Sequence, residues 1–134
     1  MATVLYTVNE SAQTVAEGGT IALGRVVHRN CQAQALLNGN SINVSGAGYF
    51  AIEATATFTG SAGLASISLL NDGVAVPGAT VSATISTADA ETHTLSFACE
   101  IMKTPCKPYI SLTLASTGVA LNVTNVAVRV KRDA

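Results

Sequence analysis

Three residues that can take part in acid–base chemistry, Asp89, Glu91 and His93, occupy every second position at the start of one apolar run. Side chains at alternate positions of a strand point to the same face, so these groups could share a proton or hold a cation. They fall in a short polar stretch at the start of an expected strand, where charged residues are usually solvated. We therefore expect a solvated cluster at a loop edge here rather than an acid–base set or an ion site.

No other combination of residues has the spacing of a known reaction centre. His28 and Cys31 are three positions apart, and on an extended chain this spacing sends the two side chains to opposite faces. Serine is abundant, but no G-x-S-x-G elbow is present. Gly46 and Gly48 form part of a turn without a following helix that could hold a phosphate. The sequence therefore predicts no enzyme, no cofactor and no metal.

The chain has an odd set of three cysteines, Cys31, Cys99 and Cys106. Cys99 and Cys106 flank the segment EIMKTP and could face each other across a strand connection, so a disulfide between them is geometrically possible. Nothing else in the sequence indicates an oxidising compartment. We favour buried or half-buried free thiols and keep the disulfide as the alternative.

Charge is scarce throughout the 134 residues, which are expected to form one domain. Charged residues are 11% of the chain, against about 25% in an ordinary soluble domain. Much of the outside must therefore consist of small or hydroxylated side chains, or be covered by other subunits. Covered surface is the interpretation that we favour.

The distribution of charged and apolar residues also excludes several partners. The net charge is −1, and no cluster of Lys and Arg with interleaved aromatic residues precedes the last few residues, so nucleic acid is not an expected partner. The N-terminus lacks a basic segment followed by an unbroken apolar run, and every later apolar run is short. We expect neither Sec export nor a membrane span, and synthesis in a bacterial host cytoplasm.

Short runs of Val, Ile, Thr and Leu alternate with small polar residues and are bounded by Gly, Asn, Asp or Pro, which predicts an all-β chain. Helical propensity is confined to ESAQTVAE, which two glycines end at once. About ten short strands in one domain indicate a β-sandwich or jelly roll. The expected strands are Val4–Val8, Thr20–His28, Ala33–Leu37, Ser41–Val44, Tyr49–Thr59, Ala65–Asn71, Val74–Val76, Thr80–Ser86, His93–Met102, Tyr109–Ser116 and Leu121–Lys131.

Turn-forming residues fix some of the connections between these strands. Asn71, Asp72 and Gly73 supply the positive φ that a tight hairpin needs between two apolar runs. Pro77-Gly78 predicts a second break, after which a new strand begins. The prolines of KTPCKP predict a connection there rather than a central strand.

The stretch GYFAIEATATFTG, residues 48–60, contains two alternating rows of side chains. The row that begins at Phe50 and ends at Phe58 is apolar, whereas the row that begins at Tyr49 consists mostly of Ala and Thr with one Glu. The same two rows recur in the three strands expected over residues 93–102, 109–116 and 121–131. The apolar row predicts the sandwich interior, and the small, weakly polar row would let a flat sheet face approach a symmetry mate closely. A solvated Ser/Thr face is the alternative interpretation.

The order of segments from Gln13 to the C-terminus resembles a family of short phage and bacterial proteins. Their domain is similar to the C-terminal domain of the spore-surface collagen-like protein BclA and, more distantly, to the C1q/TNF-like domain. The most specific part is a strand unit followed by a turn unit. Its residues are Ile42, Val44, Gly48 and Tyr49, followed by Leu70, Asp72, Gly73, Val76, Pro77 and Gly78.

This resemblance implies a jelly-roll β-sandwich of about ten strands that forms a homotrimer about a three-fold axis. Residues 20–134 would be the TNF/C1q-like domain, and residues 1–19, which lie largely outside the family pattern, would be a possible attachment arm. The residues implied at the trimer interface are Tyr49, Ala51, Glu53, Tyr109, Ser111 and Thr113.

The function expected from assembly is that of a structural virion protein, a trimeric capsid decoration or head-fibre protein bound to a capsid or other virion protein. One alternative is a trimeric module that binds a host-surface glycan or receptor through loop residues; these would be Asn38, Asn40, Asp72, Asp89 and Glu91. Another is a spore-surface (exosporium) component, although the chain carries no collagen-like stalk. The basic residues of the terminal VRVKRDA form either a solvated strand end or a docking site for an acidic partner.

Overall fold

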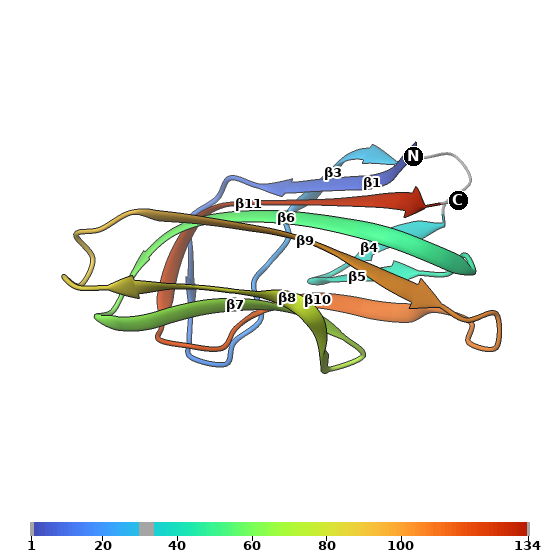
Figure 1. The fold of residues 1–134 in the computed structure, drawn as a ribbon. Helices are drawn as coiled ribbons and strands as arrows, with labels where there is room; N and C mark the ends of the chain where they lie inside the picture. Colours follow the sequence, from blue (N-terminus) through green and yellow to red (C-terminus); the bar gives the residue numbers. More distant parts are fainter. Residues whose placement is uncertain (1, 30–33, 134) are drawn as a thin grey trace.

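The computed structural model describes residues 2–29 and 34–133, and these form two facing antiparallel β-sheets (Figure 1). The described residues contain no helix, so the all-β prediction is confirmed. Sheet A has the order β3 (Arg25–Arg29), β1 (Ala2–Asn9), β11 (Leu121–Asp133), β6 (Gly48–Gly60) and β9 (His93–Lys103), with β2 (Gln13–Val15) paired to β11. Sheet B has the order β4 (Ala35–Asn38), β5 (Ser41–Val44), β10 (Ile110–Ser116), β7 (Gly63–Asn71) and β8 (Val74–Ile85).

The hydrophobic core lies between the two sheets and is built from the apolar rows that the alternation predicts. On β6, Phe50, Ile52 and Phe58 are completely buried. Leu112 and Leu114 of β10 are buried on the inner side of sheet B. Each such side chain contributes about 1.5–3 kcal/mol when it leaves water, so this layer stabilises the sandwich and fixes which row of each strand faces outward.

The hairpin between β7 and β8 forms where Asn71, Asp72 and Gly73 predict it. Asp72 and Gly73 have φ angles of 51° and 86°, the left-handed values that a tight hairpin turn requires. The Asp72 carboxylate accepts hydrogen bonds from the Ser111 backbone N–H at 2.9 Å and from Lys107 Nζ at 3.2 Å. These two bonds lower the pKa of Asp72 and attach the turn to the chain around β10.

The break predicted at Pro77-Gly78 is wrong, because β8 continues from Val74 to Ile85. The register with β7 shifts instead: Ser68 pairs with Thr80, but Leu70 pairs with Ala75. The residues between these two positions on β8 bulge out of the ladder, so the proline needs no hydrogen-bonding partner there.

The strand predicted over Thr20–His28 is also wrong in extent, because only Arg25–Arg29 form β3. The preceding residues cross from one sheet to the other. Ile21 N–H donates to the Leu114 carbonyl in sheet B at 2.8 Å, and Arg25 pairs with Val8 in sheet A. Ile21 is buried in this crossing, which explains why its apolar pattern looks like that of a strand. Likewise, the segment with helical propensity forms β2 at its centre.

Most of the expected attachment arm, residues 1–19, belongs to sheet A. β1 lies between β3 and β11, and Val4 and Leu5 are buried in the core. β2 pairs with the beginning of β11. An attachment role for this segment, which stays a prediction, would therefore be carried by strands of the sandwich.

Candidate assembly surface

The outer side of sheet A is a broad surface of mostly short side chains, which we call the sheet A face. It follows from strand alternation, because the buried rows of β1, β11, β6 and β9 leave the other rows pointing outward. At its centre, Ala127 pairs in register with Thr55 on one side and with Val8 on the other. The described side chains of the face are Tyr6, Val8, Tyr49, Ala51, Glu53, Thr55, Thr57, Thr94, Ser96, Ala98, Glu100, Met102, Ala127, Arg129 and Lys131.

Polar groups on the sheet A face bond largely to each other. Lys131 Nζ donates to Glu53 Oε1 at 2.6 Å, and this hydrogen bond is the main reason that the pKa of Glu53 is lowered. The Arg129 guanidinium lies 4.7 Å from the centre of the Tyr6 ring. Thr57 and Thr94 share a hydroxyl hydrogen bond of 3.0 Å across β6 and β9. Arg129 Nε is buried without a hydrogen-bond partner among the described residues, but the groups that are already paired lose little when another surface covers them.

The six residues implied at the trimer interface lie on opposite sides of the sandwich. Tyr49, Ala51 and Glu53 belong to β6 and lie on the sheet A face. Tyr109, Ser111 and Thr113 lie just before or within β10, and Ser111 and Thr113 alternate with the buried residues of sheet B. The six residues therefore form two groups of three on opposite faces of the sandwich. A contact that covers one face alone cannot include both groups.

The open edge between β8 and β9 is a second surface, which the sequence analysis missed. β8 ends sheet B and β9 ends sheet A, so side chains between these two strands are covered on one side only. Leu95, Phe97 and Cys99 of β9 are only half-buried there, as is Val81 of β8. Nothing in the sequence distinguishes this row from a core row, because the alternation is the same in both.

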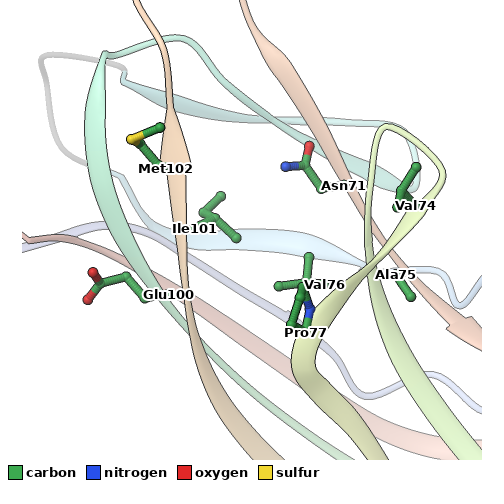
Figure 2. A pocket seen from close by; sticks show the side chains of 8 residues that line it. All are labelled: Asn71, Val74, Ala75, Val76, Pro77, Glu100, Ile101 and Met102. Carbon is green, nitrogen blue, oxygen red and sulfur yellow. The ribbon is translucent and has the colours of Figure 1, made fainter.

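A cavity of about 300 Å³ opens at one end of this edge. Figure 2 shows residues 74–77 of β8 on one side of the cavity and residues 100–102 of β9 on the other. Asn71 completes the lining, and its side-chain oxygen is buried without a partner among the described residues. The cavity thus continues the open edge toward the β7–β8 turn.

The cysteines near the open edge are free thiols. Cys99 is half-buried and Cys106 is exposed, and the disulfide alternative between them is not formed. Burial raises the pKa of the Cys99 thiol, which keeps it protonated at neutral pH. Cys31, and with it the expected relation to His28, lies outside the described residues.

Solved structures show the same arrangement of strands along nearly the whole chain. The globular domain of zebrafish complement 1qA protein covers 98% of this chain and 100% of its own, with a TM-score of 0.67 at 6% identity. Eiger TNF from S. frugiperda covers 100% and 96%, with a TM-score of 0.69 at 9% identity. The fold is a C1q/TNF-like jelly roll.

The PRD1 vertex protein P5 has this jelly roll too, covering 98% of this chain and 97% of its own with a TM-score of 0.62 at 11% identity. No family model matches the sequence. No curated protein matches it significantly either. At identities this low the likeness concerns the fold alone, so the resemblance predicted from the ordered strand pattern is confirmed for the architecture, which has 11 strands.

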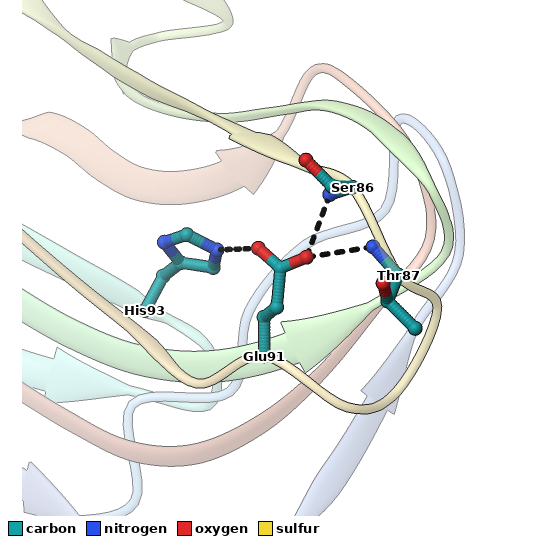
Figure 3. Close-up of polar contacts among 4 residues, drawn as sticks. All are labelled: Ser86, Thr87, Glu91 and His93. Carbon is teal, nitrogen blue, oxygen red and sulfur yellow. Dashed lines mark hydrogen bonds and ion pairs between the residues drawn. The ribbon is translucent and has the colours of Figure 1, made fainter.

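Glu91 closes the loop between β8 and β9 of the jelly roll (Figure 3). One carboxylate oxygen accepts hydrogen bonds from the backbone N–H groups of Ser86 at 2.9 Å and Thr87 at 2.6 Å. The other oxygen lies 3.2 Å from His93 Nε2, and the His93 ring stacks on Phe58. Glu91 therefore acts as an anchor for the loop.

Asp89 does not join Glu91 and His93, because its carboxylate accepts a hydrogen bond from Asn122 instead. Among the described residues, no group of three or more His, Cys, Asp and Glu side chains is placed to hold a metal. No helix in the described part of the jelly roll is long and apolar enough to cross a membrane.

The loop anchor predicts a dependence of stability on pH. Hydrogen bonds, chiefly from Thr87 N–H, lower the pKa of Glu91 below 4.5, so the folded state favours the carboxylate. The stability that the Glu91 carboxylate contributes is fully present when the pH is above its pKa in the unfolded chain. It is lost as the pH falls through its lower pKa in the folded protein. Glu91→Gln should therefore lower the melting temperature slightly at pH 7, and the difference from the unaltered chain should vanish in acid. A difference that persists in acid would contradict this role; melting curves across pH measure it.

Proposed function

We propose that this chain is a structural virion protein that assembles as a homotrimer and decorates a phage capsid or forms a head fibre. The observation that carries the proposal is the presence of two unlike, incompletely covered surfaces on one chain: the sheet A face and the open edge between β8 and β9. Supporting it, the structurally similar PRD1 protein P5 is named a vertex protein.

The two surfaces differ in shape and chemistry. The sheet A face has short side chains and a hollow at Ala127 and Thr55, whereas the open edge exposes parts of Leu95 and Phe97. If the face of one copy covers the edge of the next, the contact is heterologous, and such contacts form a closed ring when the rotation between neighbours permits. The family resemblance supports three copies in that ring.

Assembly of this kind accounts for the low charge content of the chain. A standard protein interface uses about 800 Å² of each partner. Each copy in a ring uses two such patches, which together would cover about a quarter of the 6379 Å² that the single chain exposes. The charged residues that lie outside the sheet A face are then concentrated on a smaller solvent-exposed surface.

The physical role that we propose is non-covalent: the trimer adds a rigid β-structure to the particle, and no cofactor takes part. Its site would be the virion, and its partner a capsid or other virion protein. Purified particles test this role directly. Mass spectrometry should find the chain in copy numbers that are multiples of three, and imaging at near-atomic resolution should show its jelly roll on the surface. Absence of the chain from purified particles would remove the virion assignment.

A further inference from the structure

Charge is distributed unequally between the two ends of the sandwich. We call one end the termini end: it contains the β9–β10 connection and, as Figure 1 shows, both ends of the chain. The opposite, distal end contains the β8–β9 and β10–β11 connections. The basic residues at the termini end are Arg29, Lys103, Lys107, Lys131 and Arg132. The acidic residues toward the distal end are Glu10, Glu17, Asp89 and Glu91; Arg25 pairs with Glu10 and lies near the middle of the long axis.

The net charges of the two ends have opposite signs. At the termini end, the five basic residues and three acidic ones, Asp72, Glu100 and Asp133, sum to +2. Toward the distal end, the four acidic residues, together with Arg25 that pairs with Glu10, sum to −3. The chain as a whole carries only −1, so this separation along the long axis is large relative to the net charge.

Exposed apolar side chains gather at the termini end as well. Leu36 of β4 belongs to neither assembly surface, lies beside the start of β10 and is 40% exposed. Tyr109 is 52% exposed, and Val74 in the β7–β8 hairpin is 70% exposed. At the distal end, Leu64 is the one large apolar side chain that is exposed among the described residues. Apolar and aromatic side chains next to cations are the usual composition of a protein-binding surface.

Two cations of this end, Lys103 and Arg132, are held in place by backbone carbonyls that do not neutralise their charge, whereas Lys107 pairs with Asp72. Lys103 is buried, and its ammonium donates to the Lys107 carbonyl, which fixes the β9–β10 connection. Arg132 Nη2 donates to the Ala47 carbonyl at 2.8 Å, and the guanidinium lies 5.5 Å from the centre of the Phe50 ring. Fixed cations beside a rigid apolar patch form a pre-organised surface.

We propose that the termini end is the docking surface for an acidic patch on a partner protein, and that the acidic distal end points away from that partner. This inference rests on the proposed function and adds the chemistry of the partner surface to which the trimer would bind. Both assembly surfaces run along the sides of the sandwich, so a ring built from them aligns the long axes. Three termini ends then face the same way and triple the charge that meets the partner.

A protein partner fits this end better than a polyanion such as a sulfated glycan. A net charge of +2 per chain supplies steering, but the exposed Tyr109, Val74 and Leu36 at this end also need apolar contacts in return. Polyanions supply charge without that apolar surface. The same reasoning predicts that an acidic polypeptide with aromatic residues binds better than one without them.

Two variants of β3 form a matched pair for the test. Arg29 and Arg25 are both exposed and lie on the same strand, but Arg29 lies four residues nearer the termini end, whereas Arg25 lies at the level of Ala127, near the middle of the long axis. The probes are immobilised poly(Glu,Tyr), poly-Glu and heparin, measured at several salt concentrations. We expect the unaltered protein to bind poly(Glu,Tyr) most tightly, R29E to weaken binding about tenfold, equal to ~1.4 kcal/mol, and R25E to leave it unchanged. Y109S should reduce the preference for poly(Glu,Tyr) over poly-Glu.

Each remaining outcome overturns the inference. Equal effects of R29E and R25E would show that binding is not confined to the termini end, and absence of binding to poly(Glu,Tyr) would remove the acidic partner. Tightest binding to heparin, weakened by R29E, would favour an anionic glycan instead. The molar mass of every sample is measured in parallel, so failure of docking in an intact trimer is distinguished from failure of the proposed assembly.

Discussion

Replacing Ala127 by arginine is expected to leave a folded monomer at concentrations at which, in our proposal, the unaltered chain forms a trimer. Ala127 lies at the centre of the sheet A face, between Thr55 and Val8, and its side chain points away from the core. The new side chain would add bulk and a cation beside Arg129. An uncompensated buried charge costs about 3–5 kcal/mol, and the substitution recurs at each of three contacts. Light scattering gives the mass, and circular dichroism checks the fold.

The control for this substitution is Thr113→Arg. Thr113 lies on the outer side of sheet B, is half-buried as Ala127 is, and belongs to the other group of three residues that the family resemblance implies at the interface. We expect this variant to remain trimeric. Dissociation by T113R but not by A127R would place the interface on the β10 side and would contradict the assignment of the sheet A face.

Phe58→Ala is expected to lower the free energy of unfolding by about 3–5 kcal/mol. Phe58 is completely buried on β6, and its ring is stacked on His93 with 6.1 Å between centroids. Truncation leaves a cavity that the two facing sheets cannot close, and it removes the aromatic contact. Urea denaturation measures the change, with A127R as the monomeric background, because oligomerisation makes apparent stability depend on concentration.

Phe97→Ala provides the matched comparison. Phe97 is half-buried at the open edge, so the same truncation in the monomer should cost clearly less than at Phe58. In the otherwise unaltered chain, however, it should weaken assembly, because we assign this side chain to the contact with the neighbouring copy. If F97A leaves the trimer as stable as before, the open edge is not a contact surface.

The local sequence pattern predicted those features of the fold that depend on residues close to one another in the sequence. Strand alternation identified Phe50 and Phe58 as core residues, because the side-chain period of a strand is two wherever the strand lies. The β7–β8 hairpin followed from Asp72 and Gly73, because few residues adopt positive φ without strain. The small residues of the sheet A face were likewise identified from one row of β6.

Features that depend on contacts between distant segments could not be predicted from pattern. β6 and β10 show the same alternation of apolar and small polar side chains, but they lie in different sheets. Tyr49 and Tyr109 therefore lie on opposite sides of the sandwich, which the alternation alone does not reveal. The apolar run around Ile21 crosses between the sheets. The open edge exists because β8 and β9 are the last strands of their sheets, and strand order is set by the whole chain.

The most direct test of the assembly is the molar mass of the purified protein, measured by light scattering at low and at high salt. The proposed assembly predicts three times 13.6 kDa in both conditions, because the two acidic and two basic residues of the sheet A face balance each other, and its Glu53–Lys131 pair lies within one chain. A stable, freely soluble species of 13.6 kDa, with the outer side of sheet A accessible to water, would contradict it.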